Sequence, residues 1–156
     1  MVADNEGVYV DAGPLSYQVQ LSRELNPYST EDRQYLVGTN VAPPKPDEFY
    51  FAVFMWAKNE GPHPAVTSNS FDIVDTQGNR YYPIAINPSI NSYAWTSQTL
   101  KHLQTEPAAD TTASFGPTQG SLLLFKLNIS AYANRPLTLQ IHSPGEAIPS
   151  SVSLDL

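Results

Sequence analysis

The chain has 156 residues, a formal net charge of −7 and no cysteine, which fits one domain and excludes thiol catalysis, disulfide scaffolds and thiolate metal sites. Its eight basic residues are scattered, so it lacks the clustered cations that binding to nucleic acid or anionic lipid requires. Its 14 prolines and eight glycines punctuate the sequence, and no helical periodicity lasts three turns, which is typical of an all-β sandwich or barrel.

The first residues, MVADNEGVYVDAG, are acidic and show neither the basic nor the apolar region of a signal peptide. We expect residues 1–13 to form a flexible acidic lead-in and residues 14–156 to form the folded domain. The longest apolar run, FYFAVFMWA at residues 49–57, has nine residues, fewer than the roughly 20 of a spanning helix. We therefore expect no direct membrane insertion, and we expect a signal or anchor to have been removed from this chain.

Two strands are predicted in the first third of the chain. The stretch LSYQVQL alternates strictly, which predicts a half-buried strand whose inward side chains are Leu15, Tyr17, Val19 and Leu21. The stretch EFYFAVFMWAK, residues 48–58, is apolar on both faces, and such a strand must be covered on both sides. We predict that it is central, with one face on the sandwich core and the other under a long loop.

Between these strands lies RELNPYSTEDRQYLVG, residues 23–38, which we call the clamp segment. Ser29 or Thr30 can cap a short helical turn near residues 29–36. We predict that Tyr28, Tyr35 and Leu36 point from this turn onto the outer face of the 48–58 strand. The residues assigned to this structural clamp are Arg23, Glu24, Asp32, Arg33 and Tyr35.

The alternative interpretation of the clamp segment is acid–base chemistry by Glu24 with Glu31 or Asp32. Acids and bases are in near balance there, and the segment contains no histidine and no candidate nucleophile. Charged clusters are more often solvated or paired than catalytic, so the structural interpretation is favoured.

The rest of the chain predicts further strands. Residues 71–74 and 80–84 form a hairpin whose turn contains Gly78 and Asn79. Residues 85–120 are the least regular part, with one strand expected near residues 93–96. Strands are expected at 120–129, 137–143 and 151–156, with one helical turn in the connection SAYANRP. About seven or eight strands in all predict an immunoglobulin-like β-sandwich.

The order and spacing of several stretches resemble a bacterial cell-envelope domain family of unknown function with a telokin-like, immunoglobulin-like fold. The stretches that carry this resemblance are SRELNP and EDRQYLVG, FYFAVFMWAKNEG, FDIVDTQGNRYYPI, GPTQGSLLLFKL and NRPLTLQI. The similarity covers roughly residues 14–156, nearly the whole chain. The resemblance implies a β-sandwich behind a signal, lipoprotein or membrane anchor, and an extracytoplasmic location. It implies no activity and no catalytic residues.

Four aromatic residues in turn-rich sequence are candidate ligand or partner contacts: Tyr81, Tyr82, Tyr93 and Trp95. Flat aromatic rings beside asparagine and glutamine side chains can bind sugar rings or a protein surface. The alternative is that an irregular segment needs these rings for its own packing, and we consider this alternative more common.

Two metal hypotheses are weaker. The three histidines, His63, His102 and His142, are separated by 39 and 40 residues and form no local metal motif, although they could meet in space. Asp72 and Asp75 could join a loop calcium site, but Asp75 at the start of the hairpin turn is better explained as a turn former.

The sequence favours a non-enzymatic immunoglobulin-like domain that contacts an unidentified protein at a bacterial cell surface. We expect no catalytic residue, no cofactor and no resident metal. The first alternative is a carbohydrate-binding module that stacks glycan on exposed aromatics. The second is an envelope protein that carries metal on its histidines.

Overall fold

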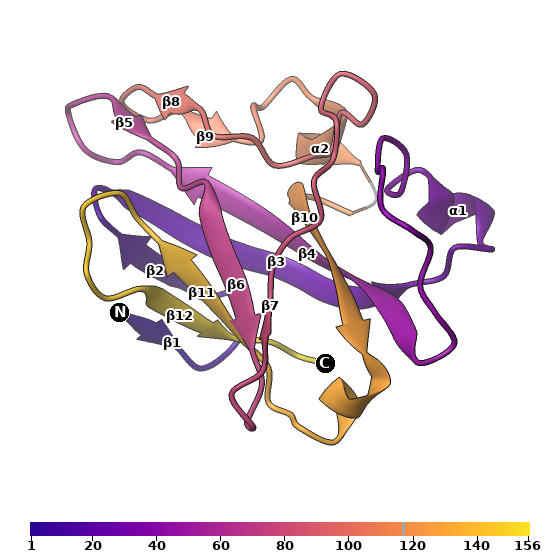
Figure 1. Ribbon diagram of the computed structural model, residues 1–156. Coiled ribbons are helices and arrows are strands. Elements are labelled where there is room, and N and C mark those ends of the chain that lie inside the picture. The colour runs from indigo at the N-terminus through magenta and orange to yellow at the C-terminus, as the bar shows by residue number, and fades with distance from the viewer. Residues whose placement is uncertain (117) are drawn as a thin grey trace.

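The computed structural model describes residues 1–116 and 118–156, which form a sandwich of two β-sheets (Figure 1). The first sheet has the strand order β1-β12-β11-β6-β7 and consists of Val2–Ala3 (β1), Ser150–Ser153 (β12), Thr138–His142 (β11), Ser70–Val74 (β6) and Arg80–Tyr81 (β7). The second has the order β10-β4-β3-β2, with β9 beside β4, and consists of Ser121–Asn128 (β10), Glu48–Lys58 (β4), Leu15–Leu25 (β3), Tyr9–Ala12 (β2) and Thr105–Glu106 (β9).

The remaining elements are short. Strands Ala65–Val66 (β5) and Thr99–Leu100 (β8) pair in a separate ribbon, and the helical turns are Thr30–Arg33 (α1), Thr112–Phe115 (α2) and Ile129–Tyr132 (η1). Seven strands in the described part of the chain have four or more residues. The predicted all-β sandwich with a short helical turn within residues 29–36 is therefore confirmed. None of the helices in the described ranges is long and apolar enough to cross a membrane.

The main core lies between the two sheets. Its largest fully buried side chains are Leu15, Tyr17, Phe51, Met55, Ile73, Phe125 and Leu127. They come from alternate positions of the strands, because successive side chains of a strand point to opposite faces. Alternation within residues 137–143 and 151–156 predicts six inward side chains; Leu137, Leu139, Ile141, Val152 and Leu154 are buried, and Leu156 packs partly buried against the core.

Strand β4 is central in its sheet and buried on both faces, as its composition predicts. One set of its side chains, which includes Phe51 and Val53, belongs to the main core. The other set, which includes Tyr50, Ala52 and Phe54, lies on the outer face of the sheet in a second apolar cluster, which we call the outer cluster. The other buried members of the outer cluster are Leu25, Tyr35, Leu122 and Leu124. Trp56 is only half-buried and does not belong to it.

A β-bulge in β3 corrects one predicted side chain. The register with β4 shifts between Val19 and Leu21, so one extra residue separates them on this strand. Leu15, Tyr17 and Val19 are buried as predicted, but Leu21 is 39% exposed. After the bulge the strand presents Leu25 to the outer cluster.

The first 13 residues are not a lead-in outside the sandwich. Val2 and Ala3 pair in parallel with β12, and β2 pairs with β3 from Tyr9 to Ala12. Ala3, Val10 and Ala12 are buried in the main core. The folded domain therefore includes residues 1–13. The segment is acidic overall, but its apolar side chains face the core from two short strands that pair at sheet edges.

The middle of the chain differs most from the prediction. The strand expected near residues 93–96 is reduced to one bridge between Ala94 and Leu122, and β7 ends at Tyr81. Residues 84–95 instead run along the free edge of β10, where the Ile84 amide donates to the Leu124 carbonyl and the Trp95 amide to the Leu122 carbonyl. This segment covers part of the outer cluster with Ile84, Ile86 and Tyr93.

Candidate functional site

The clamp segment folds around one buried carboxylate. Ser29 caps α1, and its hydroxyl accepts a hydrogen bond from the Asp32 amide at 3.4 Å. The two oxygens of Asp32 have different partners: Oδ1 accepts from Arg23 Nη2 and Oδ2 from the Asn26 amide, both at 2.8 Å. The hydrogen bond from Arg23 holds the pKa of Asp32 below its usual value, despite burial, which would raise it. Asp32 is thus held in its charged form.

Two further charged residues of the clamp segment also have partners in the protein. Arg33 donates to the Tyr28 carbonyl at 3.3 Å, and Glu24 accepts a hydrogen bond from the Tyr132 hydroxyl. The structure therefore brings Arg23 and Asp32 together but gives Glu24 a different neighbour. This arrangement supports the role of a structural clamp more than that of an acid–base pair.

Tyr35 joins the clamp segment to the sandwich. It is 1% exposed, and its ring packs edge-on against Phe54 at 5.1 Å and against Tyr93 at 4.9 Å. The buried Asn91 amide group donates to the Tyr35 and Val37 carbonyls at 3.0 and 3.1 Å. The sequence places Asn91 beside the candidate aromatic residues but does not predict its contact with the clamp segment, because Tyr35 lies 56 residues away along the chain.

Tyr28 does not point toward apolar protein as predicted. Its side chain is 86% exposed, although its backbone is held by Asn26 and Arg33. It lies at the rim of a groove of about 930 Å³, which we call the proline groove. The floor of the groove includes buried side chains of Leu25, Phe49 and Tyr50, and its walls contain Pro27, Pro43, Pro44 and Pro46.

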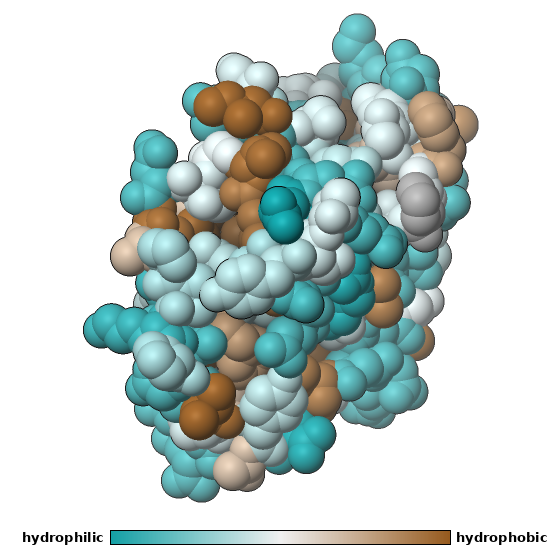
Figure 2. Space-filling view, turned by 90° about the vertical axis from the view of Figure 1, so that its right-hand side faces the viewer, coloured by the Kyte–Doolittle hydropathy of each residue, from teal (hydrophilic) through white to brown (hydrophobic). Residues whose placement is uncertain are grey.

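The proline groove carries more negative than positive charge. Its charged lining residues are Glu24, Asp32, Glu48 and Lys45. Tyr50, at the floor, is 7% exposed, and burial raises the pKa of its hydroxyl. This hydroxyl makes no hydrogen bond to another described residue, and it is not among the fully buried polar atoms that lack a partner. Figure 2 shows the side of the molecule that carries α1, where brown apolar patches are separated by teal polar side chains.

The four candidate aromatics do not form one exposed platform. Tyr81 and Trp95 pack against the main core, and Tyr93 packs against the outer cluster. The Trp95 ring nitrogen donates to the Ser68 carbonyl at 2.9 Å, and its ring meets Phe71 at 5.5 Å. Only Tyr82 is largely exposed, at 66%. Tyr82 and Trp95 nevertheless line the same pocket, of about 410 Å³, together with Asn69 and Ser70.

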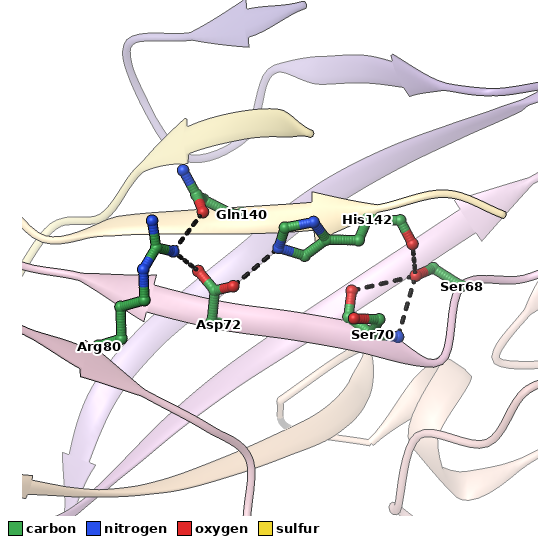
Figure 3. Close-up of polar contacts among 6 residues, drawn as sticks. All are labelled: Ser68, Ser70, Asp72, Arg80, Gln140 and His142. Carbon is green, nitrogen blue, oxygen red and sulfur yellow. Dashed lines mark hydrogen bonds and ion pairs between the residues drawn. The ribbon is translucent and has the colours of Figure 1, made fainter. Parts of the chain in front are cut away.

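A polar network covers the outer face of the first sheet (Figure 3). Buried Asp72 accepts from Arg80 at 3.2 Å and contacts the Nε2 atom of His142 at 2.7 Å, and Arg80 also donates to Gln140 at 2.9 Å. Ser68 lies close by, but its hydroxyl donates to the His142 backbone carbonyl and not to the imidazole ring. The network therefore contains an Asp–His pair to which Ser68 adds no nucleophile.

The metal hypotheses gain no support. Asp72 is occupied by Arg80 and His142, whereas Asp75 accepts hydrogen bonds from Gln77 and Asn79 within the hairpin turn. The ring of His102 contacts the Gly61 carbonyl, while that of His142 contacts Asp72. Among residues 1–116 and 118–156, no group of three or more histidine or carboxylate side chains is arranged to hold a metal ion.

Glu106 is a buried carboxyl group that the sequence analysis missed. It is fully buried in β9 beside Ala57, and Oε2 accepts a hydrogen bond from the Thr96 amide at 3.1 Å. Within the described structure Oε1 has no partner. Burial raises the pKa of Glu106 to about 7. Nothing in the local sequence TEPAA distinguishes this glutamate from an exposed one.

Solved structures of three Bacillus proteins have a similar fold. The YjhA protein from Bacillus subtilis superposes with a TM-score of 0.57 at 13% identity, over 97% of this chain and 99% of that one. A "putative lipoprotein", YcdA, from the same species has a TM-score of 0.56 at 13% identity. A conserved hypothetical protein from Bacillus anthracis has a TM-score of 0.51 at 10% identity, over 94% of this chain and 93% of that one.

These similarities establish the fold and not the activity. YcdA is longer: 98% of this chain matches it, but the match spans only 39% of YcdA. No protein-family model and no curated protein matches the sequence. The expected resemblance to bacterial proteins with this sandwich is thus supported at the level of structure.

Proposed function

We propose that this chain is a non-enzymatic domain that mediates protein contacts at a bacterial cell surface, and that it does so through the proline groove. The observation that carries this proposal is Tyr28, an aromatic side chain 86% exposed at the rim of a groove with a buried apolar floor. Tyrosine is enriched at the energetic centres of protein interfaces, because it combines a large apolar ring with a polar tip.

The cell-surface location rests on analogy between folds. One Bacillus protein with this fold bears the name of a lipoprotein, and a lipoprotein is tethered to the outside of a membrane. A signal or anchor would then precede this domain in the gene product. Sequencing of the open reading frame upstream of this chain tests that part: a lipobox or a spanning helix supports it, and a direct cytosolic start contradicts it.

The absence of catalysis is supported by the contacts of the charged groups. Asp32 is held by Arg23, Glu24 is held by Tyr132, and the Asp72–His142 pair has Arg80 as its further charged partner. Acid–base groups need a reachable substrate proton, and each of these carboxylates is engaged by a donor from the protein itself. We therefore assign these residues to structure and the groove to binding.

The test is capture of an envelope protein by three variants of the domain. Tyr28→Ala removes the exposed ring, and Tyr9→Ala is a matched control, since Tyr9 is 56% exposed on β2 and does not line the groove. We expect wild type and Tyr9→Ala to retain the same partner from envelope extract and Tyr28→Ala to retain at least tenfold less. Equal capture by all three variants, or no capture by any, would overturn the proposal.

A second candidate function is glycan binding at the pocket lined by Tyr82 and Trp95. The specific observation is that this pocket combines an exposed tyrosine ring with the polar side chains of Asn69 and Ser70. Tryptophan fluorescence titrated with wall sugars would report on Trp95 directly. A saturable change that Tyr82→Ala abolishes would favour this function, and no response to any sugar would end it.

A further inference from the structure

The walls of the proline groove are held in place before any partner arrives. Residues 39–47, which carry three of its four prolines, are anchored at both ends: Thr39 forms a bridge with Ile86, and the Ile129 amide donates to the Asp47 carbonyl at 2.8 Å. In between, Lys126 donates to the Ala42 carbonyl at 3.3 Å. Because proline also fixes its own backbone angle, little conformational entropy is lost when a ligand enters.

The floor offers a hydrogen-bond donor that the protein itself does not use. Tyr50 is 7% exposed and lines the groove, and its hydroxyl makes no hydrogen bond to another described residue. The hydroxyl is not one of the fully buried polar atoms without a partner, so it is open to a ligand in the groove. A helical ligand has satisfied its own carbonyls, and so it has little use for such a donor. A polyproline-type segment leaves its carbonyls free, and aromatic-lined grooves recognise it through such donors and through packing of its proline rings.

The charged residues that line the groove favour a ligand with positive charge. Asp32 is already neutralised by Arg23, but Glu24 and Glu48 face only one cation of the lining, Lys45. Glu24 accepts from an uncharged tyrosine hydroxyl, which leaves its negative charge in place. A cationic side chain in the ligand would therefore be attracted and an acidic one repelled.

We propose that the proline groove binds an extended, proline-containing segment of a partner protein that carries arginine or lysine. Its proline rings pack against Tyr28 and the proline walls, one of its carbonyls accepts from Tyr50, and its cation lies near Glu48. This inference rests on the proposed function and specifies the chemistry of the partner.

The experiment measures the binding of fluorescein-labelled peptide pools to the whole chain by anisotropy. The first pool contains peptides with alternating Pro and Leu and two Arg; the second has Glu in place of Arg; the third has Gly in place of Pro. We expect the first pool to bind at least tenfold more tightly than the other two. We also expect its affinity to fall as salt concentration rises.

Conservative variants assign the binding to the groove. Tyr50→Phe removes only the hydroxyl and should weaken binding of the first pool about fivefold, since one hydrogen bond is lost. Glu48→Gln, which keeps the acceptor for the Lys45 amide at 3.0 Å, should reduce the salt dependence. Tyr82→Ala, outside the groove, should change nothing. Circular dichroism and thermal unfolding establish that each variant is folded.

Failure of this inference is distinguishable from failure of the proposed function. Equal binding of the three pools, absent binding of all of them, or no effect of Tyr50→Phe would overturn the assignment of a cationic proline segment. Protein capture that still depends on Tyr28 would then leave the groove as a contact site for a partner of other chemistry. Loss of that dependence as well would overturn both.

Discussion

Both faces of β4 are buried apart from the half-buried Trp56 on the outer face, but they are covered by different kinds of structure. The inner face packs on strands of both sheets, whose positions are fixed by continuous ladders of backbone hydrogen bonds. The outer face is covered by the clamp segment and by residues 84–95, which are held mainly by single contacts such as those of Asn91 and Asp32. Single contacts can break one at a time, so the outer cover can open locally while the sandwich stays folded.

The largest predicted effect compares two phenylalanines of β4 that are both fully buried, Phe51 on the inner face and Phe54 on the outer face. We expect Phe51→Ala to lower the free energy of unfolding by about 4–5 kcal/mol, and Phe54→Ala by about 3 kcal/mol. The outer cavity should cost less because loops can collapse into it more readily than strands can. Urea denaturation measures both, and a larger loss for Phe54→Ala would contradict the comparison.

The next prediction concerns the pH dependence of the inner region. Burial raises the pKa of Glu106 from its usual 4.5 to about 7, so the folded protein binds this proton more tightly than the unfolded chain does. The contribution of Glu106 to the free energy of unfolding is therefore complete below pH 4.5. It falls by about 3 kcal/mol as the pH rises from 4.5 through 7. Glu106→Gln should remove this fall.

The measurement is the free energy of unfolding of wild type and Glu106→Gln between pH 4.5 and 8. The amide that Glu106→Gln introduces does not titrate, so any effect it has on the free energy of unfolding is the same at every pH. The difference between the two proteins in how that free energy changes with pH therefore reports on the carboxyl group of Glu106. Parallel curves for the two proteins would show that Glu106 does not retain its proton on folding in this range.

A smaller effect is expected for the polar contact that holds the outer cover. Asn91→Ala removes the side-chain donor of the Tyr35 carbonyl, whose hydrogen bond is buried, and of the Val37 carbonyl, whose hydrogen bond is partly buried; the loss should cost about 2 kcal/mol. The loss should appear first as proteolysis or hydrogen exchange within residues 23–38, with β4 still protected. Equal loss of protection in β4 would mean that the cover and the core unfold as one unit.

The smallest effect is expected for the ion pair of the clamp segment. Asp32→Asn should lower stability by about 1 kcal/mol at pH 7, because Arg23 is partly exposed and its attraction is screened. The matched control is Glu60→Gln, which breaks an exposed contact with Lys58 at 3.9 Å and should have almost no effect. The pKa of Asp32 is lowered on folding, so its contribution is present above pH 4 and disappears as the pH falls. Acid titration of both variants measures this difference.

The sequence predicts the inner region better than the outer one, for a physical reason. Alternation along a strand is a local pattern, so the bounds of β4, its two apolar faces and the inward residues of β11 could be deduced directly. The β-bulge in β3 interrupts that pattern without any glycine or proline to mark it, and so Leu21 was assigned to the wrong face. The acidic composition of residues 1–13 concealed two short strands in the same way.

The outer region depends on contacts between distant residues. The clamp segment is visible in the sequence because its capped turn and its charge pair are local. Its partners Asn91 and Tyr93 are not, because an irregular segment gives no periodicity from which to place them. The proline groove depends on how residues 24–28 and 43–50 approach one another, and neither stretch alone predicts a site.

The central claim is that the clamp segment is a locally held cover over the outer face of β4. Native-state hydrogen exchange in increasing urea tests it most directly, by comparing the amides of Tyr35 and Leu36, which donate within the clamp segment, with those of Phe51 and Val53 in β4. The account predicts that the clamp amides exchange through an opening of lower free energy, which Asn91→Ala lowers further without changing β4. The same opening free energy for all four amides, in both proteins, would contradict it.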